Sequence, residues 1–479
     1  MTLDVHSNPA TPMLPKTTEK TAWSSIYIAG LCAIFQSTQF SIFFASMWPY
    51  ILTLQHDVKQ NDFGIVVALY SFSQCVCSPL FGYWSNKIKE VRLPLIVGFC
   101  IMAFGNLFYL SLQFWNNYHL YVMMAARFTA GAGTGNMSLL RAYVSTASNS
   151  HDRSRAIAFV SGGIALGSML GPALQILFST LGAEGVDILG FNLSIYTSPA
   201  LFCLILNIFG LSIVIFLFNE KNTSMKRTNS DDGEVNESKF DRPDNLALFV
   251  CIATRFIQIF LTTTIESIGS AYSMMMFSFE KEEAVEMNAI SHTVGGVIAA
   301  LLYVSFIFTN IRKYLKMRLF TVLSITISLF WFVSTYPYPF YSQTVKISVN
   351  GSDADCDSQK YNWCETLTRV PIWNYYSGYV IVFGTAFSIL NITTTTLFSK
   401  IIGQRPQGTY QGFYQMSGSV GRLTAPIMMS ATYTLYGPKV PWVISMLLFS
   451  IVILMWIVFR NRMIPFDKRQ ARLREKNGK

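Results

Sequence analysis

Long apolar runs, separated by short polar and basic connections, dominate the chain from residue 24 to residue 460. A transmembrane helix needs about 20 mostly apolar residues, and twelve runs meet this requirement. Their predicted limits are 24–53, 62–84, 93–115, 117–144, 154–181, 191–218, 245–278, 285–309, 317–336, 371–397, 408–435 and 439–460. The pattern therefore predicts an all-α membrane protein with twelve transmembrane helices.

Composition supports the membrane assignment and narrows the function. Hydrophobic residues make up 51% of the chain and charged residues only 13%, whereas soluble domains carry about 25% charged residues. This excludes a soluble enzyme, a disordered scaffold and a coiled coil. No nucleophile, base and orienting group recur at usable spacing, so we expect no enzymatic activity, no cofactor and no metal. The net charge of +10 is spread over short loops, which argues against a nucleic-acid partner.

The distribution of Lys and Arg predicts the orientation, because cytosolic loops carry an excess of these residues. With both termini on one side, that side holds 26 of them, the opposite side holds 6, and 4 lie within spans. Both termini are therefore predicted to be cytosolic. The long loop 337–370 on the other side carries a glycosylation sequon at Asn350. It also carries Cys356 and Cys364, which can form a disulfide in an oxidising lumen or remain two free thiols.

The spans divide into two halves of similar length. We predict a tail at 1–22, a six-helix bundle at 23–218, a polar linker at 219–244, a second bundle at 245–460 and a basic tail at 461–479. Each half has a basic loop after its second span and a glycine-rich fifth span with a proline. In the first half that fifth span contains Gly171 and Pro172. Such a 6+6 parallel repeat is typical of transporters with a solute site near the membrane midplane.

Two motifs carry a resemblance to the major facilitator superfamily. The segment from Gly82 through Asn86 and Lys87 resembles the signature of its loop 2–3, although that signature usually has an acid where Asn86 stands. The spacing of Arg127 from three glycines resembles the motif of its fourth helix. The resemblance implies a gating or packing role for a set of residues in these and related segments: Gly82, Asn86, Lys87, Gly131, Gly133, Gly135, Gly171, Pro172 and Arg422.

Three further segments narrow the resemblance to an endolysosomal branch of the superfamily. They are Ser46–Tyr50, Arg405–Tyr410 and Ser417–Arg422. This branch implies a multi-pass protein of lysosomal or endosomal membranes, linked to permeation of chloride or another anion and acting as a monomer. Its partners are then a small solute and the lipid bilayer.

Charged residues inside the spans are the candidates for solute contact, because each costs about 2.5–3.5 kcal/mol to insert. Arg127 and Arg255 each lie about ten residues into a span, which is close to mid-depth at about 1.5 Å per residue. Glu266 follows Arg255 by three turns. We expect the two arginines to face one another across a cavity that stays positive and attracts anions. The alternatives are that Arg127 is structural and that Glu266 pairs with an arginine and cancels the field.

The remaining charged candidates have other expected roles. Arg141, at the cytosolic end of its span, is expected to snorkel to the surface. Arg422 is expected to act in gating or packing. His292 can carry a proton, since its unperturbed pKa is about 6.5, or can be a packing residue.

These residues leave three hypotheses for function. The first is permeation of chloride or a small organic anion. The second is proton-coupled export of a neutral or zwitterionic solute, with Glu266 or His292 as the proton carrier. The third is a non-transporting sensor on the same fold.

Overall fold

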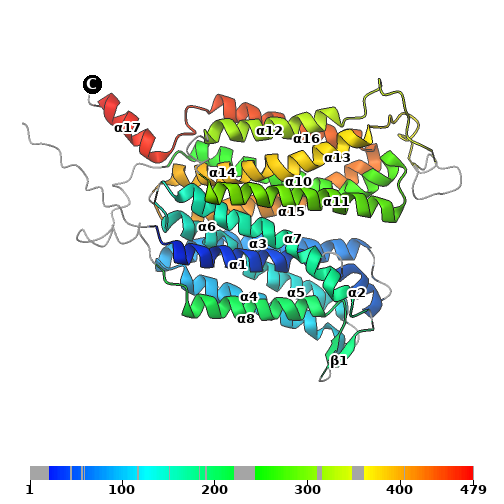
Figure 1. The fold of residues 1–479 in the computed structure, drawn as a ribbon, viewed down its shortest axis with the longest axis horizontal. Helices are drawn as coiled ribbons and strands as arrows, with labels where there is room; N and C mark the ends of the chain where they lie inside the picture. The colour runs from blue at the N-terminus through cyan, green and yellow to red at the C-terminus, as the bar shows by residue number, and fades with distance from the viewer. Residues whose placement is uncertain are drawn as a thin grey trace, which may run out of the picture.

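The computed structural model describes residues 21–43, 46–55, 58, 60–115, 118–149, 151–182, 184–188, 191–220, 243–309, 316–347, 356, 361–403 and 405–477. Its helices run lengthwise, side by side, in two groups that follow one another in the chain (Figure 1). Within the described residues, nine helices are long and apolar enough to cross a membrane. Asn350 and the side chain of Pro172 lie outside the described part of the chain.

The first group of helices follows the predicted spans closely, with three differences. It comprises α1 (Trp23–Ser41), α2 (Met47–Leu54), α3 (Gln60–Ile88), α4 (Arg92–Ser111), η1 (Leu112–Phe114), α5 (His119–Thr134), α6 (Met137–Thr146), α7 (Arg153–Ser179) and α8 (Ser198–Phe216). The predicted spans 24–53 and 117–144 are each two helices. The predicted span 191–218 begins late, because residues 191–193 form β2 (Phe191–Leu193), paired antiparallel with β1 (Val186–Ile188).

The second group comprises α10 (Asn245–Phe277), α11 (Lys281–Phe308), α12 (Met317–Ser334), α13 (Ile372–Ile381), η4 (Val382–Ala386), α14 (Phe387–Ile402), α15 (Gly408–Tyr436) and α16 (Lys439–Val458). The carboxylate of Asp244 caps α10 by accepting hydrogen bonds from the backbone N–H groups of Leu246 and Ala247. A further helix, α17 (Phe466–Asn477), lies in the predicted basic tail. The tail is therefore largely helical, whereas its sequence predicted only a basic segment.

Three helical segments fall outside the nine apolar helices: α1–α2, α5–α6 and α15. Together with the nine they are consistent with twelve spans. These segments carry buried polar side chains, such as Gln36 on α1, Arg127 on α5 and Gln411 on α15. Their lower hydropathy has a physical reason, since a helix that lines the interior between two bundles does not need an apolar surface all round.

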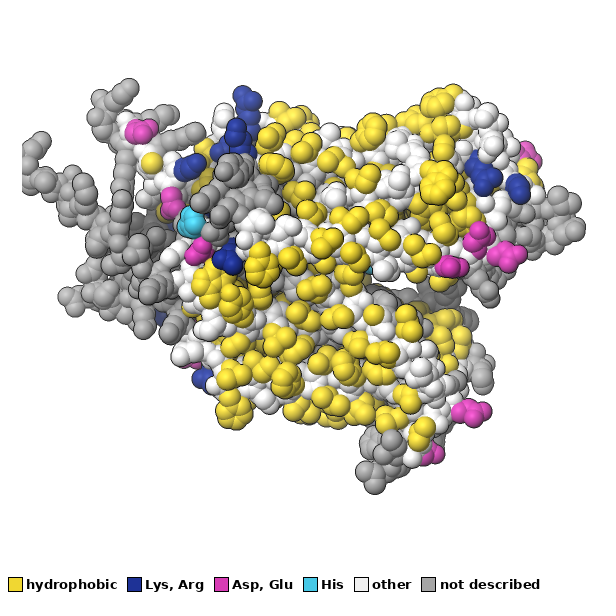
Figure 2. Space-filling view, viewed as in Figure 1, with side chains coloured by type: hydrophobic (Ala, Val, Ile, Leu, Met, Phe, Trp, Pro, Cys, Tyr) yellow, Lys and Arg dark blue, Asp and Glu magenta, His cyan; other side chains and the backbone are white. Residues whose placement is uncertain are grey.

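The surface agrees with a membrane environment. Hydrophobic side chains cover the middle of the molecule, and charged side chains gather at its two ends (Figure 2). Each group also has an apolar interior of its own. The core of the second group contains Tyr272, Trp331 and Trp442, all at most 3% exposed. The first group has two clusters, one around Phe99 and one around Phe43.

Candidate functional site

The two groups of helices are in close contact at one end of the molecule and apart at the other. At the end that carries α17, the last turns of α3 pack against the first turns of α15. At the opposite end the surface is hollowed between the groups (Figure 2). Following the charge distribution, we call the α17 end the cytosolic end and the other end the lumenal end. On this face the two groups are therefore separated at the lumenal end and in contact at the cytosolic end (Figure 2).

Glycines allow the close crossing of α3 and α15. Gly82 packs directly against the backbone of Gly408, and a Cβ atom on Gly82 would lie 2.6 Å from the carbonyl carbon of Gly408. A Cβ atom on Gly412 would lie 2.7 Å from the Cα atom of Pro79. Carbon atoms that are not bonded normally approach to about 3.5–4.0 Å. The crossing therefore has no room for side chains at these positions.

Asn86 connects the two halves at the start of α15. Its Oδ1 atom accepts a hydrogen bond of 3.0 Å from the backbone N–H of Gly408. Its Nδ2 atom donates to Oγ1 of Thr409 at 2.8 Å. A neutral amide thus satisfies an otherwise free N–H at a helix N-terminus, where the family signature usually has an acid. Lys87, the next residue, is exposed.

A second polar link lies about three turns deeper along both helices. Ser419 of α15 donates a hydrogen bond of 2.9 Å to Oε1 of Gln74 on α3. The Nε2 atom of Gln74 donates to Oγ1 of Thr134 on α5 at 3.3 Å. Gln74 is buried and was not among the residues predicted from the sequence. An uncharged polar side chain in an apolar span was the only available signal.

Arg127 is enclosed by aromatic rings of its own half. Its guanidinium carbon lies 4.5 Å from the ring centroid of Tyr70 and 5.2 Å from that of Phe43. The residue is 3% exposed, and no described acidic residue forms an ion pair with it. Cation–π contacts take the place of a carboxylate partner and leave the positive charge uncancelled.

The glycines of the first half serve close packing. A Cβ atom on Gly133 would lie 2.7 Å from the carbonyl oxygen of Gly98 on α4. One on Gly135 would lie 3.0 Å from the backbone nitrogen of Ser78 on α3. The other two glycines, Gly131 and Gly171, pack against the backbone of Tyr70 and Ile42.

Arg255 lies in a network of neutral polar groups in the second half. Its Nη1 atom donates to Oδ1 of Asn391 at 3.0 Å and to Oε1 of Gln258 at 3.3 Å. Asn391 in turn donates from Nδ2 to the hydroxyl of Tyr303 at 3.1 Å. Arg255 is 8% exposed. All its hydrogen-bond acceptors are uncharged amides, so its charge too is not cancelled by a described neighbour.

The prediction that Arg141 snorkels to the surface is wrong. Arg141 is 2% exposed, and its Nη1 atom donates a 2.5 Å hydrogen bond to Oε1 of Gln415 on α15. Helix α15 contacts α6 and covers this side chain. Counting residues from the end of the span could not show that cover. Arg141 and Arg255 both contact α15, through Gln415 and Tyr414, whereas Arg127 contacts aromatic rings of its own half.

Arg422 on α15 reaches toward the first half. Its guanidinium carbon lies 4.3 Å from the ring centroid of Phe40 on α1. It also lies in electrostatic range of Glu266, although no ion pair joins Glu266 to an arginine in the described part of the chain. The structure therefore places Arg422 at a contact between the halves.

Glu266 and His292 lie on α10 and α11, where both side chains are exposed. The Nδ1 atom of His292 lies 3.1 Å from the hydroxyl oxygen of Tyr379 on α13. Glu266 is in electrostatic range of both His292 and Tyr379. The structure thus brings the predicted acid and the predicted histidine together, in the same half of the molecule.

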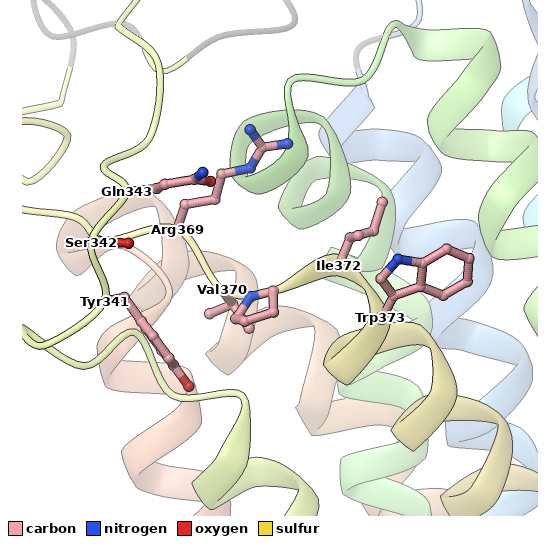
Figure 3. Close-up of a pocket in the computed structure, with 8 residues that line it drawn as sticks. Tyr341, Ser342, Gln343, Arg369, Val370, Ile372 and Trp373 are labelled. Atoms are coloured by element: carbon pink, nitrogen blue, oxygen red, sulfur yellow. The ribbon is translucent and has the colours of Figure 1, made fainter.

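The lumenal loop contains a separate cavity. Cys356 and Cys364 form a disulfide with Cα atoms 5.8 Å apart. A cavity of about 410 Å³ lies beside Arg369, whose Nη2 atom donates to the carbonyl oxygen of Phe277 at 3.0 Å. Its wall consists of Tyr341, Ser342, Gln343, Arg369, Val370, Pro371, Ile372 and Trp373 (Figure 3). No residue of the predicted solute pathway lines it.

Tyr341 in this wall is a neutral donor at physiological pH. Desolvation, with Tyr338 nearby, raises the pKa of its phenol above the ordinary value. Its hydroxyl donates to the carbonyl oxygen of Ser334 at 3.1 Å.

The chain matches a known protein family in sequence and known transporters in structure. The family model of the Major Facilitator Superfamily matches residues 29–349. Major facilitator superfamily domain-containing protein 8 of Xenopus laevis is 28% identical over 95% of this chain and 94% of its own length. The structure is similar to that of the human organic anion transporter MFSD10 (TETRAN), with a TM-score of 0.60, 13% identity and coverage of 90% and 98% of the two chains. It is also similar to the transporter FucP in the outward conformation, with a TM-score of 0.62, 11% identity and coverage of 91% and 99%.

Proposed function

The chain belongs to the major facilitator superfamily of transporters, and we propose that it moves chloride or a small organic anion across endolysosomal membranes. The solute path is the space between the halves, from the lumenal hollow toward the crossing of α3 and α15. The residues that contact the solute in this proposal are Arg127, Arg255 and Glu266. Arg141 and Arg422 contribute further positive charge.

The observation that carries this proposal is the imbalance among the candidate charged residues of the spans. These are four arginines, Arg127, Arg141, Arg255 and Arg422, and one acid, Glu266. In the described residues none of the four forms an ion pair. A cavity with positive walls of low dielectric attracts anions and repels cations.

The relatives support the proposed solute and compartment. The human protein of similar fold is named as an organic anion transporter. The similarity to the frog protein extends over nearly the whole chain, and the resemblance of Ser46–Tyr50, Arg405–Tyr410 and Ser417–Arg422 to the endolysosomal branch supports a lysosomal or endosomal location. We further propose that Asn350 is glycosylated on the lumenal side. An Asn350→Gln variant should then migrate faster on a gel, and the wild type should colocalise with a lysosomal membrane marker.

Chloride flux into liposomes that contain the purified protein tests the transport proposal. We expect flux from the wild type and its loss in an Arg127→Ala, Arg255→Ala double variant that still elutes as a monodisperse species. Arg460→Ala is the matched control, because Arg460 is an exposed arginine that follows the end of α16. Absence of both chloride and organic-anion flux from a folded wild type would refute the proposal.

A second candidate function is proton-coupled export of a neutral or zwitterionic solute. The contact between His292 and Tyr379, with Glu266 in electrostatic range, favours it. The side chains of Glu266 and His292 are exposed, and they are the proton carriers that this function requires. Solute flux that requires a pH gradient and is lost in His292→Gln, with chloride flux absent, would favour this function over anion permeation.

A further inference from the structure

Two arginines from opposite halves meet at one turn of α15. Arg141, from α6, donates its 2.5 Å hydrogen bond to Gln415. Arg255, from α10, has its guanidinium carbon 5.6 Å from the ring centroid of Tyr414. The Nε atom of Arg255 would lie 3.3 Å from a Cβ atom on Gly418. Residues three apart on a helix share a face, so both guanidinium groups lie against the same face of α15.

The structure provides no counter-charge for this pair. Arg141 and Arg255 are 2% and 8% exposed, and their hydrogen-bond acceptors are all neutral amides. In the described chain no Asp or Glu forms an ion pair with either arginine. The Nε atom of each is buried without a hydrogen-bond partner. Two like charges in a region of low dielectric repel one another strongly, and each unpaired buried donor costs further free energy.

A bound anion would offset both the repulsion between the two charges and the cost of the unpaired donors. It would supply the missing negative charge and accept charge-assisted hydrogen bonds from the free guanidinium N–H groups. The burial of both side chains favours a small ion, because little of either guanidinium surface is accessible.

We propose that Arg141 and Arg255 form one anion site between the two halves, and that a small inorganic anion bound there holds the cytosolic end closed. The proposal rests on the proposed function, since the anion is of the class transported. Arg141 belongs to the first half and Arg255 to the second. An anion can therefore contact both only while α6 and α10 are held together by α15. A ligand that binds one conformation better shifts the equilibrium toward it.

Anion-dependent closure of the purified full-length protein tests the site. Spin labels at Glu90 and Asn461, two exposed positions at the cytosolic end in opposite halves, report the separation of the halves. Chloride replaces gluconate at constant ionic strength. We expect the closed population and the melting temperature of the wild type to rise with chloride. In Arg141→Gln and Arg255→Gln the half-saturating concentration should rise roughly tenfold or more, as the loss of a hydrogen bond to a charged group implies.

Two further variants test the site even if Arg141→Gln and Arg255→Gln fold poorly. Arg141→Lys keeps the charge and should retain chloride-dependent closure with weaker affinity. Arg141→Glu supplies a tethered carboxylate beside Arg255 and should close the cytosolic end without chloride. Arg460→Gln removes an exposed charge that lies beyond the end of α16. This variant should behave as the wild type.

The outcomes separate this site from the transport proposal. Closure that is independent of chloride in the wild type, or unchanged in a folded Arg141→Gln, would overturn the site even if flux persists. Chloride-dependent closure that is lost in Arg141→Gln, in a protein without flux, would support the site and refute transport of chloride.

Discussion

Replacing Gly82 by alanine should weaken the closure of the cytosolic end. The added Cβ atom would lie 2.6 Å from the carbonyl carbon of Gly408 and 3.1 Å from the Cα atom of Thr409. Both are backbone atoms of α15, so no side-chain rotation can relieve the overlap. Contact at about 3.5–4.0 Å requires α3 and α15 to move apart by about 1 Å at their crossing.

The free-energy cost follows from the size of this overlap. Inserting a methyl group into a tightly packed site costs about 1–3 kcal/mol. The overlap exists only while the cytosolic end is closed, so the cost falls on that conformation alone. A difference of about 1–3 kcal/mol changes the ratio of closed to open protein by about 5- to 150-fold. We therefore expect a large rise in the cytosolic-open population.

The labels at Glu90 and Asn461 measure this change as a shift to longer distances, in a background whose six free cysteines are replaced by alanine. Gly64→Ala is the matched control. It adds the same methyl group to the same helix at a position with no atom within 4 Å. A Gly82→Ala distance distribution identical to those of the wild type and Gly64→Ala would refute the reasoning.

Three further predictions concern other contacts. Asn86→Ala removes two hydrogen bonds to the start of α15, each worth about 0.5–1.5 kcal/mol, and should increase the open population in the same assay. Replacing Cys356 and Cys364 by serine, a pair eight residues apart in sequence, should lower the free energy of unfolding by about 2–3 kcal/mol; thermal unfolding measures this, and reduction should have no further effect. Arg127→Lys retains the charge but loses the planar contact with Tyr70, so it should reduce anion flux in liposomes more than Tyr70→Phe, which keeps an aromatic face. Equal flux in the wild type and both variants would contradict a role for the aromatic rings around Arg127.

The sequence predicts the span limits well wherever an apolar run ends in charged or turn-forming residues. The run 245–278 corresponds to Asn245–Phe277, and the run 439–460 corresponds to Lys439–Val458. It cannot predict the helix break after Ser41, because apolar residues continue across the break and hydropathy alone does not distinguish a helix from a turn. Burial of the following Phe43 against Tyr109 is a tertiary contact.

The candidate site, like the helices, is only partly predictable from the sequence. Position along a span predicted Arg127 and Arg255 near mid-depth and Glu266 three turns from Arg255, because depth and spacing depend only on position along a helix. The environment of each charge depends on its neighbours from other helices. The aromatic enclosure of Arg127 and the cover of Arg141 by α15 both come from such neighbours, and no local pattern in the sequence contains them.

The surplus of arginines within the spans also has an electrical consequence. The four arginines and one glutamate of the proposed pathway together carry a net charge of about three elementary charges. Each charge that crosses the full membrane potential exchanges about 2.3 kcal/mol per 100 mV. A rocking motion that moves all three through one tenth of the field would exchange about 0.7 kcal/mol per 100 mV. The membrane potential would thus bias which side of the transporter is open, and a bound anion would reduce that bias by about one third.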